Sequence, residues 1–320
     1  MTVADFIAEW RGGGPQIVAH TSGSTGVPKE IRLPRSVVEA SAWRSIRHFG
    51  LRADSRLHLC LSPDYIAGKM VIVRALLSGA RFTWEPPTQE PLKDLGPENE
   101  IALLSVIGAQ VMSLVERRGS LPKIKHLLVG GAPLNAATAE AALQIADHVW
   151  ESYGMTETAS HVALREICSP EEVGTKPFKL LPGVELSCDE HGRGVIEIEN
   201  LDTLVTNDII ELCGPDEFFV KGRADNVIIT GGKKVNPEQV ERKISGAIAG
   251  RWDYFVAGVP DAKWGNLLAL VIESKPLSSV ESEALLSACA AVTSTHERPR
   301  RVICRLPFAR TASGKIIRRL

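Results

Sequence analysis

Two segments of this chain place hydroxyl groups and glycines beside a charged side chain, a combination that suits phosphate binding. The first reads Thr21-Ser22-Gly23-Ser24-Thr25-Gly26-Val27-Pro28-Lys29 and directly follows an apolar stretch. Hydroxyls and free backbone N–H groups at a tight turn can surround phosphate oxygens, and Lys29 adds a positive charge. The Walker A spacing is absent. We therefore expect a different kind of phosphate loop, with a flexible Ser/Gly turn as the alternative for this segment alone.

The second segment, Tyr153-Gly154-Met155-Thr156-Glu157, follows a strand expected at 148–152. Ligands of α/β proteins bind at the carboxyl ends of such strands. A hydroxyl next to a carboxylate there can hold a phosphate and Mg²⁺, because Mg²⁺ typically uses one or two carboxylates plus substrate phosphates. A solvated loop acid is the alternative interpretation of Glu157.

Four further segments place groups suited to a nucleotide. The small residues of Gly130–Leu134 let a flat ring approach the backbone. Asp208 closes a strand and can accept hydrogen bonds from two ribose hydroxyls. Arg223 and Lys315 add cations farther along the chain.

Short apolar runs alternate with helical patterns as far as about residue 150. The predicted strands are 16–20, 57–61, 81–84, 101–105, 125–129 and 148–152. The predicted helices are 36–49, 67–78, 108–118 and 135–146. Strands separated by helical crossovers indicate right-handed βαβ units and a largely parallel sheet.

The pattern changes twice in the second half. Short strands with turn signals are predicted at 183–188, 195–199, 204–206 and 218–221, as an antiparallel or barrel-like sheet. From about residue 225, Asn236-Pro237-Glu238-Gln239 predicts a helix start. Strands at 255–259, 267–273 and 302–306 and a helix at 280–291 complete a small α+β unit. We expect two domains, 1–223 and 224–320, joined by a short hinge.

Composition argues against several classes of protein. The 320 residues include 37 Lys and Arg and 38 Asp and Glu, so the formal net charge of −1 gives no global case for binding nucleic acid. No apolar stretch is long enough to span a membrane, and the first residues do not resemble a signal peptide. Six scattered cysteines favour reduced thiols and a cytoplasmic protein. Residues 292–320 carry eight Lys and Arg against one acid, either a solvated end or a cap for a polyanionic ligand.

The ordered set of segments, from Ile17 to Leu320, resembles the adenylate-forming acyl- and aryl-CoA synthetase superfamily. The resemblance implies an α/β fold with a truncated amino-terminal domain and a small mobile α+β carboxy-terminal domain. The amino-terminal domain would contain a mostly parallel sheet with helices and a small β-barrel-like unit. The implied activity is an ATP-dependent, AMP-forming acid–CoA ligase that uses ATP, Mg²⁺ and coenzyme A.

The resemblance also assigns roles to residues. Thr21–Lys29 would bind phosphate, with Thr156 on phosphate and Glu157 on Mg²⁺. The ribose would be held by Asp208 and Arg223. The adenine would lie against Gly131, Ala132, Pro133, Ser152, Tyr153 and Gly154.

Five residues of the carboxy-terminal domain receive roles in the same way. Asp225 matches the hinge, and Lys315 matches the lysine delivered to the carboxylate and the α-phosphate. The domain would rotate between the two half-reactions, which withdraws Lys315. The residues then brought to the pantetheine arm of CoA would be Gly231, Gly232 and Lys233.

The acyl site departs from the superfamily pattern. Relatives often carry P-x-x-H-x-x-G where this chain has Tyr65 in place of His. Lys69 could meet a second carboxylate of the substrate, and His161 could line the pocket; a surface lysine and a core histidine are the alternatives. The run Ser-Tyr-Gly-Met-Thr-Glu-Thr-Ala-Ser-His is similar to short o-succinylbenzoate–CoA ligases of menaquinone biosynthesis, whose substrate is a dicarboxylic aromatic keto acid.

Other functions remain open: another aryl- or acyl-CoA ligase, a stand-alone adenylation enzyme that loads a carrier protein, or a non-catalytic nucleotide-binding module. The expected partners are a small carboxylate and CoA, without nucleic acid or membrane, and a homodimer is left open. Relatives carry a long region before the phosphate loop, whereas here the loop begins at Thr21. We expect a compact, complete ligase. How its acyl pocket is enclosed, and whether a second subunit contributes to that pocket, stay open.

Overall fold

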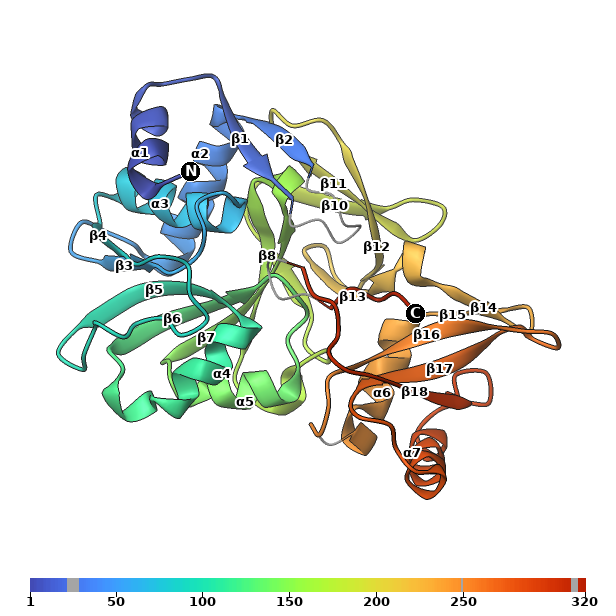
Figure 1. Cartoon of the computed structure of the whole chain (residues 1–320). Helices are drawn as coiled ribbons and strands as arrows, with labels where there is room; N and C mark the ends of the chain where they lie inside the picture. Colours follow the sequence, from blue (N-terminus) through green and yellow to red (C-terminus); the bar gives the residue numbers. More distant parts are fainter. Residues whose placement is uncertain (22–28, 249, 312–315) are drawn as a thin grey trace.

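The computed structural model describes residues 1–21, 29–248, 250–311 and 316–320 (Figure 1). A mixed sheet of eleven strands organises the first part of the chain, in the order β10-β11-β12-β13-β9-β8-β7-β6-β5-β3-β4. A smaller unit with sheets of its own follows, in yellow to red in Figure 1. Among the described residues, no helix is long and apolar enough to cross a membrane.

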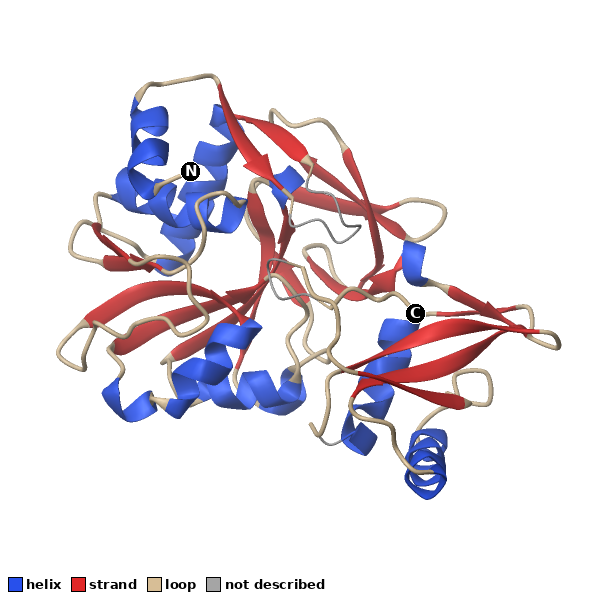
Figure 2. Cartoon of the chain, in the orientation of Figure 1, coloured by secondary structure: helices blue, strands red, loops and turns tan. Residues whose placement is uncertain are grey.

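One half of the large sheet is parallel, as expected from the alternating pattern. Its strands are β3 (Arg56–Leu59), β4 (Arg81–Trp84), β5 (Glu100–Ile107), β6 (Lys123–Gly130) and β7 (His148–Met155). Helices α2 (Arg35–Phe49) and α3 (Ile66–Ser78) cover one face, and α4 (Gly108–Glu116) and α5 (Ala136–Leu143) cover the other (Figures 1 and 2). Within β6, Leu128 packs with the first pair of helices and its neighbours with the second, which is the two-residue period of a strand covered on both faces.

Two elements near the amino terminus were not predicted. Helix α1 (Val3–Arg11) begins with a capping box between Thr2 and Asp5 and packs against α3. Strand β1 (Gln16–His20) pairs antiparallel with the unpredicted β2 (Glu30–Pro34) in a separate two-stranded sheet. The expectation that 16–20 belongs to the parallel sheet was therefore wrong. The nine residues between β1 and β2 are too few for the crossover that parallel pairing requires.

The other half of the large sheet is antiparallel. Its strands are β8 (Ser160–Ile167), β9 (Phe178–Leu180), β10 (Val184–Cys188), β11 (Arg193–Ile198), β12 (Leu204–Leu212) and β13 (Glu217–Arg223). These strands continue the central sheet and pack around a hydrophobic cluster that includes Phe178, Ile196 and Phe218, so the antiparallel expectation holds. Strands β8 and β9 were not predicted, and they join the two halves.

The smaller unit follows the end of β13. Its strands are β14 (Ile228–Thr230), β15 (Lys233–Val235), β16 (Tyr254–Asp261), β17 (Gly265–Glu273) and β18 (Arg301–Arg305), and its helices are α6 (Pro237–Ile248) and α7 (Ser279–Ala291). The Asn236 side chain accepts a 3.1 Å hydrogen bond from the Glu238 N–H, which confirms the predicted helix start. Val240, Ile244 and Leu270 belong to a hydrophobic cluster made only of residues from this unit. Arg242 of α6 donates a 2.8 Å hydrogen bond to the Lys221 carbonyl of β13.

Candidate functional site

The carboxyl ends of β6 and β7 lie side by side and carry the two segments expected to hold adenine. The Ser152 hydroxyl donates to the Val129 carbonyl across 3.1 Å. A Cβ on Gly130 would lie 2.8 Å from that hydroxyl, and Gly131 has a φ of +89°, so both positions favour glycine. Residues 131–133 that follow are exposed. The segments are thus adjacent and leave backbone open to a flat ring.

The Tyr153–Glu157 segment is fixed by its own backbone. A bulge separates Tyr153 from Gly154, and a Cβ on Gly154 would lie 2.2 Å from the Ser160 carbonyl oxygen. The segment then enters a short 3₁₀ turn, η2 (Thr156–Thr158), where the Thr158 hydroxyl bridges to the Met155 and Ser160 carbonyls at 3.0 and 2.7 Å. Thr156 and Glu157 therefore stand on a rigid turn.

The donor set at this turn fits Mg²⁺ only together with phosphate oxygens. The Glu157 side chain is partly exposed, and within the described part of the chain no hydrogen bond or ion pair occupies its carboxylate. No group of three His, Cys, Asp or Glu side chains gathers among the described residues to hold a metal alone. One free carboxylate beside a phosphate is the arrangement that Mg²⁺ accepts.

The expected ribose ligands lie together on two neighbouring strands of the antiparallel half. Asp208 and Arg223 are register partners on β12 and β13, with 3.6 Å between Arg223 Nη1 and Asp208 Oδ1. Tyr153 donates a 2.9 Å hydrogen bond to Asp208 Oδ2, which sequence reasoning did not predict. Burial, with the charge of Asp208, raises the pKa of Tyr153 above its ordinary value, so the phenol stays a donor.

The ends of the expected phosphate loop are held close together. The Thr21 N–H donates to the Lys29 carbonyl at 2.9 Å, and the Lys29 N–H donates to the Thr21 hydroxyl at 3.0 Å. Ser22, Gly23, Ser24, Thr25 and Gly26 lie outside the described residues, as does Lys315. Their roles remain predictions.

The expected hinge residue is paired with its neighbour. Arg223 donates two hydrogen bonds to Asp225, at 2.9 and 2.6 Å, and these bonds raise the pKa of Arg223. Gly231 and Gly232, at φ +54° and +75°, form the two-residue turn between β14 and β15, and Lys233 beyond them is exposed. A Cβ on Gly231 would lie 2.6 Å from the Trp264 ring, so this turn lies directly on the indole.

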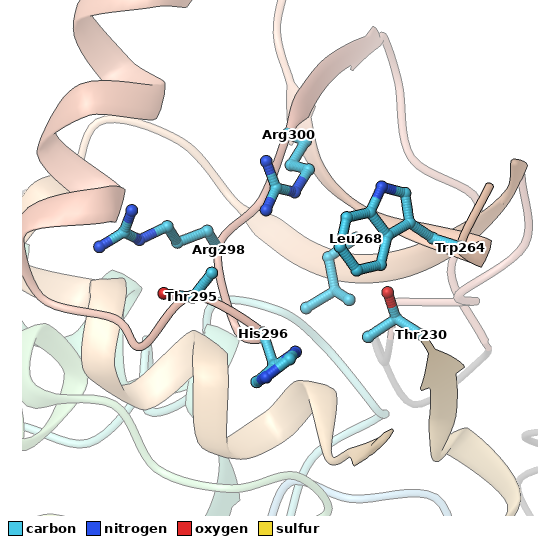
Figure 3. A pocket seen from close by; sticks show the side chains of 7 residues that line it. All are labelled: Thr230, Trp264, Leu268, Thr295, His296, Arg298 and Arg300. Carbon is cyan, nitrogen blue, oxygen red and sulfur yellow. The ribbon is translucent and has the colours of Figure 1, made fainter. Parts of the chain in front are cut away.

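A small pocket adjoins this turn (Figure 3). Its wall combines one indole, two guanidinium groups and an imidazole. The residues that line it are Thr230, Trp264, Leu268, Thr295, His296, Arg298 and Arg300. The guanidinium carbon of Arg300 lies 5.6 Å from the Trp264 ring centroid. An aromatic face beside cations suits a phosphorylated nucleotide.

The three candidate acyl-site residues lie in different surroundings. Tyr65 forms a bridge with His20, at the entry to the phosphate loop. Lys69 is buried beneath α1, where its Nζ lies 3.0 Å from the Met1 sulfur and 4.2 Å from the Phe6 ring centroid. His161 is buried on β8, and Ser45 of α2 lies 3.0 Å from its Nε2. Lys69 thus faces α1, whereas His161 packs against α2.

Two buried arginines beside His161 escaped sequence reasoning. Arg74 of α3 is 2% exposed, Arg44 of α2 is 8% exposed, and Arg74 donates a 2.8 Å hydrogen bond to the Ser160 hydroxyl. We call Arg44, Ser45, Arg74, Ser160 and His161 the arginine cluster. Arg44 Nε and Nη2 and Arg74 Nε are buried without a hydrogen-bond partner in the described structure. One sequence signal was available, because Arg74 stands inside the apolar run of α3, where a charged side chain indicates a buried polar site.

The arginine cluster is positively charged and contains no acid. Burial lowers the pKa of Arg74 to about 9, so the guanidinium keeps its charge at neutral pH. Burial, with the charges of Arg74 and Arg44, holds the pKa of His161 well below its ordinary value. Register pairs Gly154↔His161 and Met155↔Ser160 place the cluster directly behind the Tyr153–Glu157 segment.

Known proteins share this arrangement of elements. The family described as AMP-binding enzyme matches residues 11–196. A 2-succinylbenzoate–CoA ligase of Listeria monocytogenes is 25% identical over 335 residues, which cover 98% of this chain and 71% of that ligase. A 2-succinylbenzoate–CoA ligase of Enterococcus faecalis is 27% identical, over 93% of this chain and 67% of its own length.

Solved structures give the same fold. An acyl-CoA synthetase (AMP-forming)/AMP-acid ligase II-like protein from Dyadobacter fermentans is 34% identical with a TM-score of 0.62, over 98% of this chain and 91% of its own. The o-succinylbenzoate coenzyme A synthetase of Bacillus subtilis, in complex with ATP and magnesium ion, is 22% identical with a TM-score of 0.79, over 94% of this chain and 68% of its own. The latter likeness concerns the fold alone.

These comparisons confirm the expected adenylate-forming α/β fold and the resemblance to o-succinylbenzoate–CoA ligases. They also confirm an AMP-forming acid–thiol ligase, whose cofactors are ATP, Mg²⁺ and coenzyme A. Because the model of that family matches more than half of the residues, this chain belongs to the family of AMP-binding enzymes.

Proposed function

We propose that this chain joins 2-succinylbenzoate to coenzyme A, through an acyl-adenylate and with release of pyrophosphate and AMP. The observation that carries the proposal is the arginine cluster. A substrate with two carboxylates needs one at the α-phosphate of ATP and a cationic site for the other. We infer that the cluster is this site, because it lies directly behind the Tyr153–Glu157 segment.

The unpaired guanidinium nitrogens favour an anion in this place. A buried donor without an acceptor costs about 1–3 kcal/mol, and more when it is charged. Arg44 and Arg74 together carry three such nitrogens, and among the described residues no acid lies close enough to affect the pKa of either arginine. A carboxylate accepts from arginine at two oxygens and would satisfy them. The relatives that are about 25% identical to this chain are named 2-succinylbenzoate–CoA ligases, and this substrate agrees with the proposal.

The chemistry needs two anions to approach each other. The substrate carboxylate attacks the α-phosphorus of ATP and expels pyrophosphate, so the barrier is largely electrostatic and positional. Lys315 and Lys29 would offset the repulsion, and Tyr153, Asp208 and Arg223 would hold the nucleotide. Mg²⁺, held by Glu157 and the phosphates, would supply further positive charge.

Thioester formation would involve the smaller unit. The CoA thiol attacks the acyl carbonyl of the adenylate, and AMP leaves. We assign the pantetheine arm to the Gly231–Gly232 turn and the phosphorylated nucleotide of CoA to the exposed rim of the neighbouring small pocket (Figure 3). The Trp264 ring lies against the turn and also lines the pocket, so the two assigned parts of the CoA site adjoin each other. ATP and CoA are both cytoplasmic, and we propose that compartment.

AMP release by the full chain tests the proposal. The acids are 2-succinylbenzoate, benzoylpropionate, which lacks the ring carboxylate, and a saturated fatty acid, each with and without CoA. We expect CoA-dependent release with 2-succinylbenzoate and a KM for benzoylpropionate at least about tenfold higher, because the arginine cluster then has no anion to bind. Release with the fatty acid alone, or equal KM values for both aromatic acids, contradicts the assignment. Adenylate formation without thioester formation would instead indicate transfer to a carrier protein.

A further inference from the structure

A buried ion pair lies beneath the segments assigned to adenine, and nothing in the reaction described above uses it. Glu151 of β7 and Arg165 of β8 are 3% and 7% exposed and are register partners. Arg165 Nε and Nη2 both donate to Glu151 Oε2, at 2.8 and 2.6 Å. Glu151 immediately precedes Ser152, so the pair lies one residue from the expected nucleotide surface.

The second carboxylate oxygen of Glu151 holds the other adenine segment. Glu151 Oε1 accepts a 3.0 Å hydrogen bond from the Leu134 N–H. Leu134 is 6% exposed, whereas residues 131–133 before it are exposed. One buried carboxylate thus anchors the end of the 131–134 loop, and its two oxygens bind different partners. One oxygen fixes the loop, and the other is fixed by Arg165.

Arg165 is in turn held from two further sides. Its Nη1 donates to the Lys176 carbonyl at 2.9 Å, and its guanidinium carbon lies 4.3 Å from the centroid of the Phe178 ring. Phe178 and Tyr153 are in ring contact, with centroids 5.8 Å apart. The guanidinium therefore connects the Leu134 anchor to the residues that pack around Tyr153, the partner of Asp208.

We propose that Glu151 and Arg165 are positioning residues that hold the 131–134 loop in the geometry that binds the adenine of the nucleotide. The inference rests on the proposed function in one respect, the assignment of these segments to the nucleotide site. It does not depend on which acid is the substrate. A pair that merely stabilised the fold would be replaceable by apolar side chains, because burying two charges is costly in itself. A positioning pair is not replaceable, since apolar side chains offer the Leu134 N–H no acceptor.

Calorimetric binding of AMP to the full chain tests the inference. In Glu151→Gln the side chain has one acceptor oxygen and one donor nitrogen, so it cannot accept from both the Leu134 N–H and Arg165. AMP should therefore bind at least about fivefold more weakly. Arg165→Lys keeps the charge and leaves Oε1 free for Leu134, so affinity should fall less than in Glu151→Gln. The double variant Glu151→Met with Arg165→Met should keep the wild-type melting temperature or exceed it, yet bind AMP as weakly as Glu151→Gln. Glu166→Gln, which removes the exposed pair with His148 on the same two strands, is the matched control and should bind as the wild type does.

Three outcomes overturn the inference: unchanged AMP affinity in Glu151→Gln, wild-type affinity in the double methionine variant, or equal weakening in Glu166→Gln. If the double variant fails to fold, Glu151→Gln against Arg165→Lys decides alone, measured well below their melting temperatures. A wild-type chain that does not bind AMP contradicts the nucleotide site itself. That result is distinct from a wild-type chain that binds AMP but rejects 2-succinylbenzoate, which affects only the proposed substrate.

Discussion

Arg318 and Glu241 form a two-pronged ion pair, with Nη1 to Oε1 at 2.8 Å and Nη2 to Oε2 at 2.7 Å. Glu241 lies on α6, and its Oε1 also accepts a 2.7 Å hydrogen bond from the Val256 N–H. On the other side of 312–315, Arg310 pairs with Asp253 at 2.7 Å and also with Glu273. The two ends of the segment that contains Lys315 are therefore anchored to the smaller unit by arginines.

This anchoring predicts that Arg318→Ala slows adenylation. Arg318 follows Lys315 by three residues, and loss of its bidentate pair frees one end of the segment, so adenylate formation should fall about tenfold. Thioester formation from a supplied acyl-adenylate should keep its rate, because Lys315 is proposed to act only in the first step. Rapid-quench measurement of each half-reaction checks this, with the exposed Arg301→Ala as control. Equal slowing of both half-reactions would speak for general destabilisation.

Lys315→Ala should abolish adenylate formation and spare thioester formation. The lysine is proposed to offset the charge of the carboxylate and the α-phosphate only while they approach, and a lost electrostatic contact of this kind costs about 100-fold or more. Pyrophosphate exchange reports the first step, and release of AMP from supplied acyl-adenylate and CoA reports the second. The exposed Lys275→Ala serves as control. A parallel loss of both steps would contradict the alternation of the smaller unit.

Arg74→Met should separate substrate binding from stability. The side chain has a partner in Ser160 but keeps an unpaired buried nitrogen, so its removal should leave the melting temperature unchanged or higher. The KM for 2-succinylbenzoate should rise at least about tenfold, while the KM for ATP stays constant. Steady-state kinetics and thermal unfolding check both. The exposed Arg47→Met on α2 is the matched control and should leave both KM values unchanged. A Tm loss with unchanged KM values in Arg74→Met would make Arg74 structural.

Acid should destabilise the protein through a histidine on the large sheet. Burial, with His148, Lys125 and His48 nearby, lowers the pKa of His126 from 6.5 to about 4, against the raising effect of Glu166. The unfolded chain therefore binds more protons between pH 6.5 and 4, so stability present above pH 6.5 is lost as pH falls. Glu241 acts oppositely, because burial raises its pKa from 4.5 to about 6. The test therefore compares two proteins. Between pH 4 and 6.5, the free energy of unfolding in urea should change less with pH for His126→Gln than for the wild type.

Glutamine is a fair replacement because Trp150 donates a 3.3 Å hydrogen bond to His126 Nδ1, and an amide oxygen can accept it. Identical pH profiles for the variant and the wild type would show that His126 does not titrate on unfolding. His191→Gln, at an exposed position, is the matched control and should leave the profile unchanged.

The parts predicted from sequence are those with local signals. The strands before Thr21, Gly131 and Tyr153 could be found because apolar runs end there in glycines and hydroxyls. Strands β8 and β9 were missed because β8, with Arg165 inside it, does not alternate, and β9 has three residues. Pairings across the sheet, such as Tyr153 with Asp208, are 55 residues apart and leave no mark in spacing. The arginine cluster could not be predicted, because it forms only when α2 and α3 pack against β8. The sequence of a helix does not say whether an arginine in it faces solvent or the core.

The pocket beside Trp264 gives the last prediction, a loss of CoA affinity in Arg300→Ala. The guanidinium lies near the indole ring on an exposed surface, where a phosphate can approach it (Figure 3). Loss of one such charge-assisted contact should raise the KM for CoA about fivefold and leave the KM for ATP unchanged. Phosphopantetheine lacks the nucleotide, so with it the variant and the wild type should have equal KM values. Arg305→Ala, exposed at the end of β18, is the control. If the KM for phosphopantetheine rises as much as that for CoA, Arg300 acts on the pantetheine path and the pocket is not the nucleotide site.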